Sequence, residues 1–163
     1  MIYVTVGNHD QPFDMLIKAM DDLAPEYDGM VMQIGCCNYL PKNSVWSRYY
    51  PMVEAERLIN AAELVVAHAG IGTMITARKA GAPILISPRR KLRGEHFNDH
   101  QLEISEELLA RPRPLVTVCT NIDELGVKVR QALAGRKTAS GTTTGAGAIK
   151  QAIVEFLDAC GRR

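Results

Sequence analysis

Two histidines and a pair of closely spaced glycines stand where this sequence could bind a phosphorylated ligand. The hexapeptide His68-Ala69-Gly70-Ile71-Gly72-Thr73 follows a short apolar run, 64–67, and precedes a segment, 74–80, whose pattern is typical of a helix. Glycines let the backbone approach a ligand closely, and Thr73 is placed to cap the helix. The N–H groups and the positive dipole end of such a helix favour an anion, typically a phosphate. The alternative is a plain glycine turn between strand and helix.

Three further segments of this kind follow apolar runs, namely Gly7–His9 with its histidine, Gly35–Tyr39 and Pro88–Gln101. Apolar runs alternate with helical patterns along the chain, which predicts an α/β fold: a Rossmann-like parallel sheet with helices on both faces. Right-handed crossovers place the carboxyl end of every strand on one edge, so we expect all four segments to line one crevice. We expect strands at 2–6, 30–34, 64–67, 84–86 and 115–118, a short strand within 45–50, and helices at 12–23, 53–62, 74–80, 98–110 and 121–134.

Composition restricts the class of protein. A chain of 163 residues with 47% hydrophobic residues can bury one substantial core. The net charge of +1 gives no sign of a nucleic-acid partner, and no apolar run approaches the roughly 20 residues needed to cross a bilayer. The first strand pattern starts at once, without a signal peptide, and the four cysteines show no C-x-x-C spacing. We therefore expect a cytoplasmic protein with reduced thiols.

The expected crevice lacks the fingerprints of common nucleotide sites. Ile75 stands where a dinucleotide fingerprint would need its third glycine, and no G-K-[ST] of a P-loop occurs. The crevice instead offers a helix N-terminus, His9, His68 and the polar run 89–101. This set suits a ligand with phosphates and several hydroxyls, such as a nucleotide sugar.

Four motifs carry a resemblance to a known family. They are Val4-Thr5-Val6-Gly7-x-His9-x-Gln11-Pro12-Phe13, Gln33-Ile34-Gly35, His68-Ala69-Gly70-x-Gly72-Thr73 and Gly94-Glu95-His96-x-x-Asp99-His100-Gln101. From residue 1 to about 133 the chain resembles bacterial exopolysaccharide glycosyltransferase subunits, which are related to the catalytic subunit of the dolichol-linked N-acetylglucosaminyltransferase. The resemblance implies the glycosyltransferase family 28 C-terminal domain, which is the donor-binding half of a GT-B fold. It also implies a UDP-sugar as substrate and no metal or other cofactor.

The resemblance also implies roles for individual residues. Gly7, Asn8 and His9 would line the donor phosphates, and Gly70, Gly72 and Thr73 would hold the diphosphate at the helix start. Met52 would contact the base through its backbone, and His100 and Gln101 would reach the donor sugar. One position departs from the distant relatives, which place a glutamate on the ribose where this chain has Thr76. Glu95 or Glu103 could replace that contact.

The implied reaction needs a second protein. A membrane-associated partner would supply the acceptor-binding half, hold this chain at the inner face of the membrane and present a lipid-linked saccharide. The catalytic base is expected from the partner, and His9 is the one candidate base within this chain. The basic run that begins at Arg89 would favour an acidic sugar such as glucuronate over glucose. The alternative function is a non-catalytic nucleotide-binding or enhancer subunit of a membrane-bound glycosyltransferase.

Several features carry two interpretations. His68 could contact the ligand or only the backbone, and the basic run 89–93 could be a solvated loop. His96 and His100 have the spacing of two metal ligands on a helix, but no third ligand is evident, so we expect no metal site. We expect a nucleotide-sugar domain at 1–137, a flexible linker at 138–147 and an amphipathic helix at 148–163 that docks on the partner or on its own sheet.

Overall fold

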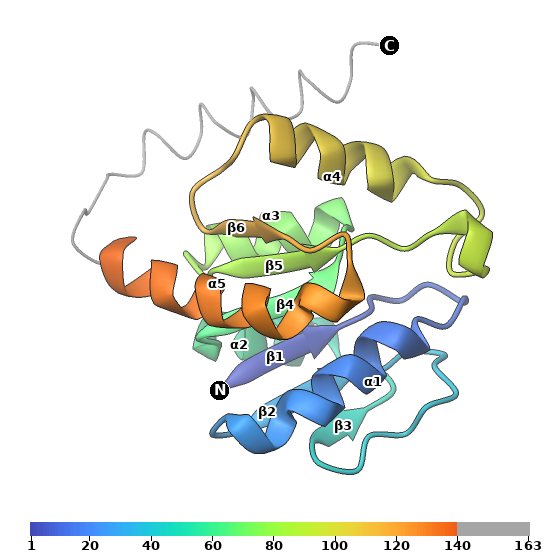
Figure 1. The fold of residues 1–163 in the computed structure, drawn as a ribbon. Helices are drawn as coiled ribbons and strands as arrows, with labels where there is room; N and C mark the ends of the chain where they lie inside the picture. The colour runs from blue at the N-terminus through green and yellow to red at the C-terminus, as the bar shows by residue number, and fades with distance from the viewer. Residues whose placement is uncertain (140–163) are drawn as a thin grey trace.

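A parallel six-stranded sheet forms the centre of the protein in the computed structural model, which describes residues 1–139 (Figure 1). The strands lie in the order β3-β2-β1-β4-β5-β6. Their bounds are β1 Ile2–Thr5, β2 Met30–Gln33, β3 Val45–Ser47, β4 Leu64–His68, β5 Ile84–Ser87 and β6 Val116–Val118. This confirms the predicted α/β Rossmann-like sheet, including the short strand expected within 45–50.

Helices cover both faces of the sheet, which explains why its central strands are apolar at nearly every position. Helices α1 (Asp14–Leu23) and α5 (Leu125–Ala139) contribute to one buried apolar cluster, and α2 (Met52–Ala61), α3 (Ile71–Lys79) and α4 (His100–Ala110) contribute to the other. Three short 3₁₀ turns complete the described part: η1 Ala24–Glu26, η2 Lys91–Arg93 and η3 Ile122–Glu124.

The strand order reverses between β1 and β4, which are direct neighbours paired from Ile2↔Leu64 to Thr5↔Ala67. The chain leaves β1 toward one side of the sheet and leaves β4 toward the other. Ligands of open α/β sheets bind in the crevice that such a switch point opens at the carboxyl ends of the strands. The fold therefore places the loops after β1 and β4 at the centre of the candidate site.

The structure corrects several expected boundaries. Helix α3 begins at Ile71 with Gly70 as its N-cap, so Thr73 lies inside the first turn and makes no side-chain cap. Helix α5 continues to Ala139 instead of ending at 134, because a single glycine such as Gly135 costs a helix only about 1 kcal/mol. The first two residues of the predicted 138–147 linker thus belong to α5. The rest of that linker and the predicted C-terminal helix lie outside the described residues.

Within residues 1–139, none of the helices combines the length and the apolar character that crossing a membrane requires.

Candidate functional site

The imidazole of His68 fills the space between the loops after β1 and β4. His68 is the last residue of β4, and its ring lies against two glycines. A Cβ atom at Gly7 would come within 2.6 Å of His68 Cε1, and a Cβ atom at Gly70 would collide with Nε2. Gly7 also has φ +71°, which disfavours other residues. Both positions therefore need glycine to make room for the histidine.

Gly72 differs from these two glycines, because a Cβ atom there would meet nothing within 4 Å. It is the second residue of α3, so its open side lies at the helix N-terminus. The N–H groups of the first helical turn have no acceptor within the helix, and the dipole adds a partial positive charge. The first turn of α3 can thus approach an anion without steric hindrance from the Gly72 position.

His68 is held neutral at physiological pH. Burial, followed by the positive charge of Arg89, lowers the pKa of His68 to about 4. Its Nδ1 atom is buried without a hydrogen-bond partner among the described residues, although the nearby Thr5 backbone partly opposes the pKa shift. A buried polar atom without a partner is costly and is uncommon outside functional or strained sites. Of the two ring nitrogens, Nε2 is the one that lies against Gly70, the N-cap of α3, whereas Nδ1 is buried closer to Gly7.

His9 is positioned as a hydrogen-bond donor. Its Nδ1 accepts the backbone N–H of Gln11 at 3.2 Å, so in the neutral ring the proton resides on Nε2. Asp10 Oδ1 lies 3.1 Å from the same Nδ1, but its side chain is 84% exposed and can turn to water, whereas the backbone N–H is fixed. Burial, His96 and Arg89 lower the pKa of His9. This geometry argues against the expected role of His9 as the base and favours donation from Nε2–H.

Arg89 differs most from expectation, because it is fully buried and does not lie in a solvated loop. Its Nη1 donates to the carbonyl oxygens of Gln11, Pro12 and Glu95, and its Nη2 donates to that of Val6. The guanidinium also lies 5.0 Å above the Phe13 ring. None of the described carboxylates lies within ion-pair distance of Arg89, and burial lowers its pKa. A guanidinium used in this way is not available to bind a donor carboxylate. It keeps a positive charge behind the crevice that the acidic groups of Glu95 and Asp10 offset only from a distance.

Gln33 orders the loop after β1 and was not among the residues expected at the site. Its Nε2 donates to Asn8 Oδ1 at 3.0 Å and to the Gly7 carbonyl at 3.2 Å. Its Oε1 accepts the Tyr3 hydroxyl and the Tyr50 backbone N–H. The sequence carries a signal for this role, since a polar residue that ends an otherwise apolar strand needs buried hydrogen-bond partners.

The loop after β5 brings the remaining expected residues to the same edge, with mixed outcomes. Gln101 is buried, and its Oε1 accepts the Arg89 N–H, so its amide NH₂ group remains for a ligand. Glu95 is also buried, and its Oε2 accepts the Arg90 N–H, which leaves it badly placed to bind a ribose. His100 is exposed and pairs with Glu103 at 3.1 Å. Met52, the first residue of α2, is 79% exposed, as a backbone contact to a base would allow.

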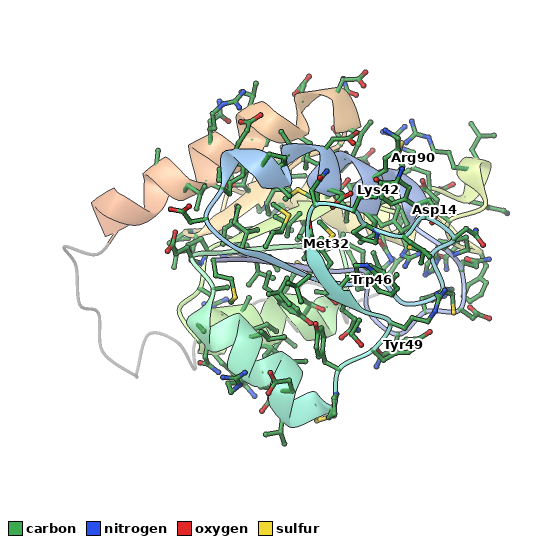
Figure 2. The ribbon with its side chains drawn as sticks, turned by 90° about the horizontal axis from the view of Figure 1, so that it is seen from below. Asp14, Met32, Lys42, Trp46, Tyr49 and Arg90 are labelled. Carbon is green, nitrogen blue, oxygen red and sulfur yellow. The ribbon has the colours of Figure 1, made fainter. Side chains whose placement is uncertain are left out.

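Two aspartates of α1 hold the loop 38–44, and Figure 2 labels one of them, Asp14, together with Lys42 of the loop. Asp14 accepts the backbone N–H groups of Asn38 and Tyr39, and the buried Asp21 accepts those of Lys42 and Asn43. Burial alone would raise the pKa of both carboxyl groups, but these hydrogen bonds outweigh it and lower each pKa. Neither aspartate is therefore free to bind a metal. Across the described residues, no group of three or more His, Cys, Asp or Glu side chains is placed to hold one.

A sequence match that covers all the described residues and extends beyond them identifies the family. Residues 1–155 match the sequence profile of the glycosyltransferase family 28 C-terminal domain. The chain belongs to this family. Human UDP-N-acetylglucosamine transferase subunit ALG13 is 30% identical to the family 28 chain over 123 residues, which are 66% of this chain and 10% of ALG13.

Solved glycosyltransferases share the fold of the family 28 chain. Spinosyn forosaminyltransferase SpnP superposes with a TM-score of 0.62 and 20% identity over 94% of this chain and 39% of that one. The glycosyltransferase of kitacinnamycin superposes with a TM-score of 0.61 and 18% identity, over 86% of this chain and 37% of that one. The calicheamicin glycosyltransferase CalG4 superposes with a TM-score of 0.55 and 17% identity, over 99% of this chain and 44% of that one. The chain thus spans about two fifths of these GT-B enzymes, as expected for one of the two Rossmann-like halves.

Proposed function

We propose that this chain is the donor-binding half of a two-component glycosyltransferase that takes the sugar from a UDP-sugar. The anion site at the switch point carries the proposal. The first turn of α3 is open at Gly72, the neutral ring of His68 lies against its N-cap Gly70, and the buried charge of Arg89 lies at the same edge of the sheet. Family membership and the relation to a subunit named as a UDP-N-acetylglucosamine transferase support a nucleotide sugar as the ligand.

In the proposed reaction an acceptor hydroxyl attacks the anomeric carbon of the sugar and UDP leaves. The N–H groups of α3, together with the field of Arg89, stabilise the negative charge that develops on the leaving diphosphate. His9 donates its Nε2–H to a phosphate oxygen. We propose that these groups balance the charge without a metal ion. The partner subunit supplies the base that takes the acceptor proton, since the Nδ1 lone pair of His9 already accepts the Gln11 N–H.

Calorimetry on the isolated chain tests the donor class. We expect UDP to bind more tightly than ATP or NAD, because the sequence lacks the P-loop and dinucleotide fingerprints. Tighter binding of ATP or NAD would contradict the proposal. If this chain binds UDP but the partner is fully active without the donor site of this chain, the alternative function, a non-catalytic enhancer subunit, would be favoured.

The acceptor and the partner are tested by transfer assays. We propose a lipid-linked saccharide acceptor of exopolysaccharide synthesis, presented at the inner face of the membrane by a membrane-associated partner. The chain alone should then show little transfer, and co-expression with the acceptor-domain partner should restore it. Deleting residues 138–163 should weaken partner capture more than UDP binding. Efficient turnover of a lipid-linked acceptor by the purified chain alone would exclude the two-component assignment.

The identity of the sugar now depends on other residues of the basic run. Arg89 is buried, so a preference for glucuronate would fall to Arg90, which is half-buried and donates from Nη2 to the Thr120 carbonyl. A donor panel should show a lower glucuronate-to-glucose ratio in Arg90→Ala. An unchanged ratio would remove glucuronate selection by this loop from the proposal.

A further inference from the structure

The most exposed large apolar side chain of the described residues lies in the loop between β5 and α4. Leu92 in η2 is 97% exposed, and Phe97 in the same loop is 62% exposed. A single exposed leucine is common on protein surfaces and needs no explanation by itself. The structure of the turn and the charges around Leu92 decide whether its exposure has a use.

The turn that carries Leu92 is tightly hydrogen-bonded. Arg93 N–H and Gly94 N–H donate to the carbonyls of Arg90 and Lys91, at 3.2 and 2.9 Å. Gly94 has φ +69°, a conformation that closes the turn and that other residues rarely adopt. Side chains fix the stem as well, since Lys91 N–H donates to Asp99 Oδ1 at 2.9 Å. The backbone therefore holds Leu92 away from the protein and does not leave it free to fold back.

The charges at the tip are mostly positive. Exposed Lys91 and Arg93 flank Leu92 on either side, and Arg93 Nη1 also contacts Met15 Sδ at 3.3 Å. Of the acids in the loop, Glu95 is buried on the Arg90 N–H, and Asp99 uses one oxygen to accept the Lys91 N–H.

The neighbouring loop after β1 contributes exposed Asp10 and the ring of His9, which clusters with two rings of the loop between β5 and α4. The rings of His9, His96 and Phe97 lie 4.7–4.9 Å apart between centroids. Figure 1 shows the turn as the yellow-green coil at the right-hand extremity, beyond the carboxyl ends of the strands. The turn thus exposes Leu92 between two exposed cations, and the same loop exposes Phe97, which packs against His9 and His96.

We propose that the loop Lys91–Phe97 contacts an anionic lipid surface. Leu92 and Phe97 enter the interfacial layer, and Lys91 and Arg93 pair with lipid phosphates. Such a contact is weak and salt-sensitive, because two apolar groups and two cations supply little binding free energy compared with a membrane-spanning helix. It complements a partner that already resides at the membrane, since two weak contacts of one molecule reinforce each other.

The consequence for the reaction rests on the proposed function, whereas the lipid contact does not. The loop follows β5 and lies at the ligand edge of the sheet, so insertion of its tip would turn the crevice toward the bilayer. A lipid-linked saccharide would then meet the donor site at the surface where its lipid resides.

The test uses the full chain and vesicles of phosphatidylcholine, alone or mixed with phosphatidylglycerol. We expect binding to the mixed vesicles that weakens with added salt. Lys91→Gln and Arg93→Gln should each reduce it about fivefold, the equivalent of about 1 kcal/mol per cation near an anionic surface. Leu92→Ser should reduce binding several-fold, whereas Leu109→Ser, at a 53% exposed leucine of α4, should not. Leu92→Ser should still bind UDP, which separates this test from that of the donor site.

A fluorescence measurement locates the contact. In a Trp46→Phe background, which removes the single tryptophan of the chain, Leu92→Trp should shift its emission to the blue on mixed vesicles and Leu109→Trp should not. Equal shifts at both positions, or vesicle binding that persists unchanged in Leu92→Ser, would overturn the proposal. The proposal would also be overturned if the unmodified chain did not bind vesicles while Leu92→Ser lost partner capture, because the loop would then contact protein.

Discussion

Replacing Arg89 by methionine tests whether one buried cation links the two loops of the site. The guanidinium donates to four carbonyl oxygens at 2.7–3.2 Å and lies 5.0 Å above the Phe13 ring. The carbonyls belong to the loop after β1 and to the loop after β5. Methionine keeps an apolar stem of similar length and removes every donor together with the charge.

The expected loss of stability follows from these contacts. A buried carbonyl left without its donor costs about 1–3 kcal/mol. Water entering the gap, together with relief of the buried charge, recovers part of this, so we expect a net loss of about 3–5 kcal/mol, as for other broken buried charge networks. For a chain of this size that corresponds to a fall in Tm of about 10 °C. Arg90→Met is the matched control, because Arg90 donates one side-chain bond, to Thr120 at 2.7 Å, and should cost about 1 kcal/mol.

A second readout separates the charge from the packing. Arg89 contributes to the low pKa of His68, so the pKa of His68 should rise above about 4 in Arg89→Met, as measured by NMR titration of the imidazole protons. Arg89→Lys keeps the charge but cannot reach all four carbonyls, so it should lose stability while the pKa of His68 stays low. An Arg89→Met protein with the Tm of Arg90→Met and an unchanged His68 pKa would refute the reasoning.

Three further predictions concern other parts of the site. Gly72→Val and its control Gly135→Val should both keep the fold, because neither new Cβ atom meets a neighbour within 4 Å. Only Gly72→Val should abolish UDP binding in calorimetry, since its side chain would block the approach to the backbone. Normal UDP binding by Gly72→Val would show that the turn is merely structural. Asp21→Asn should lower the free energy of unfolding by about 3 kcal/mol in urea titrations, because it weakens the hydrogen bonds that hold loop 38–44. The control Asp22→Asn removes an exposed pair with Lys18 and should cost under about 0.5 kcal/mol. Similar losses in the two variants would contradict this prediction. The pKa of His68 is lowered from 6.5 to about 4, so between these pH values the unfolded chain binds a proton that the folded chain does not. The free energy of unfolding should therefore fall by about 2 kcal/mol from pH 7 to pH 5. His68→Gln should remove most of this pH dependence.

The frame of the protein was predictable because local patterns determine it. Short apolar runs alternating with helical periodicity left a parallel sheet as the natural arrangement, and the polar segments at the strand exits indicated which edge binds ligand. The least accurate predictions were helix ends, where the energy differences are small. Thr73 looked like a cap because it follows Gly72, but the helix starts two residues before it, at Ile71.

The roles of charged side chains were less predictable because distant residues decide them. Arg89 stands in a run with Arg90, Lys91 and Arg93, and nothing local shows that it alone turns fully inward. Its acceptors include carbonyls 78 and 83 residues away in sequence. The tautomer of His9 likewise depends on the path of the Gln11 backbone, which no residue spacing determines.

The electrostatics of the site bear on how the proposed reaction divides between two subunits. Burial, assisted by the positive charge of Arg89, lowers the pKa of both His9 and His68, which makes each a weaker base. A bound diphosphate would cancel that field, but it would also attract any proton that these rings acquire. The histidines therefore serve the leaving group better than the attacking hydroxyl. A base for the acceptor therefore works best outside this field, on the half of the enzyme that binds the acceptor.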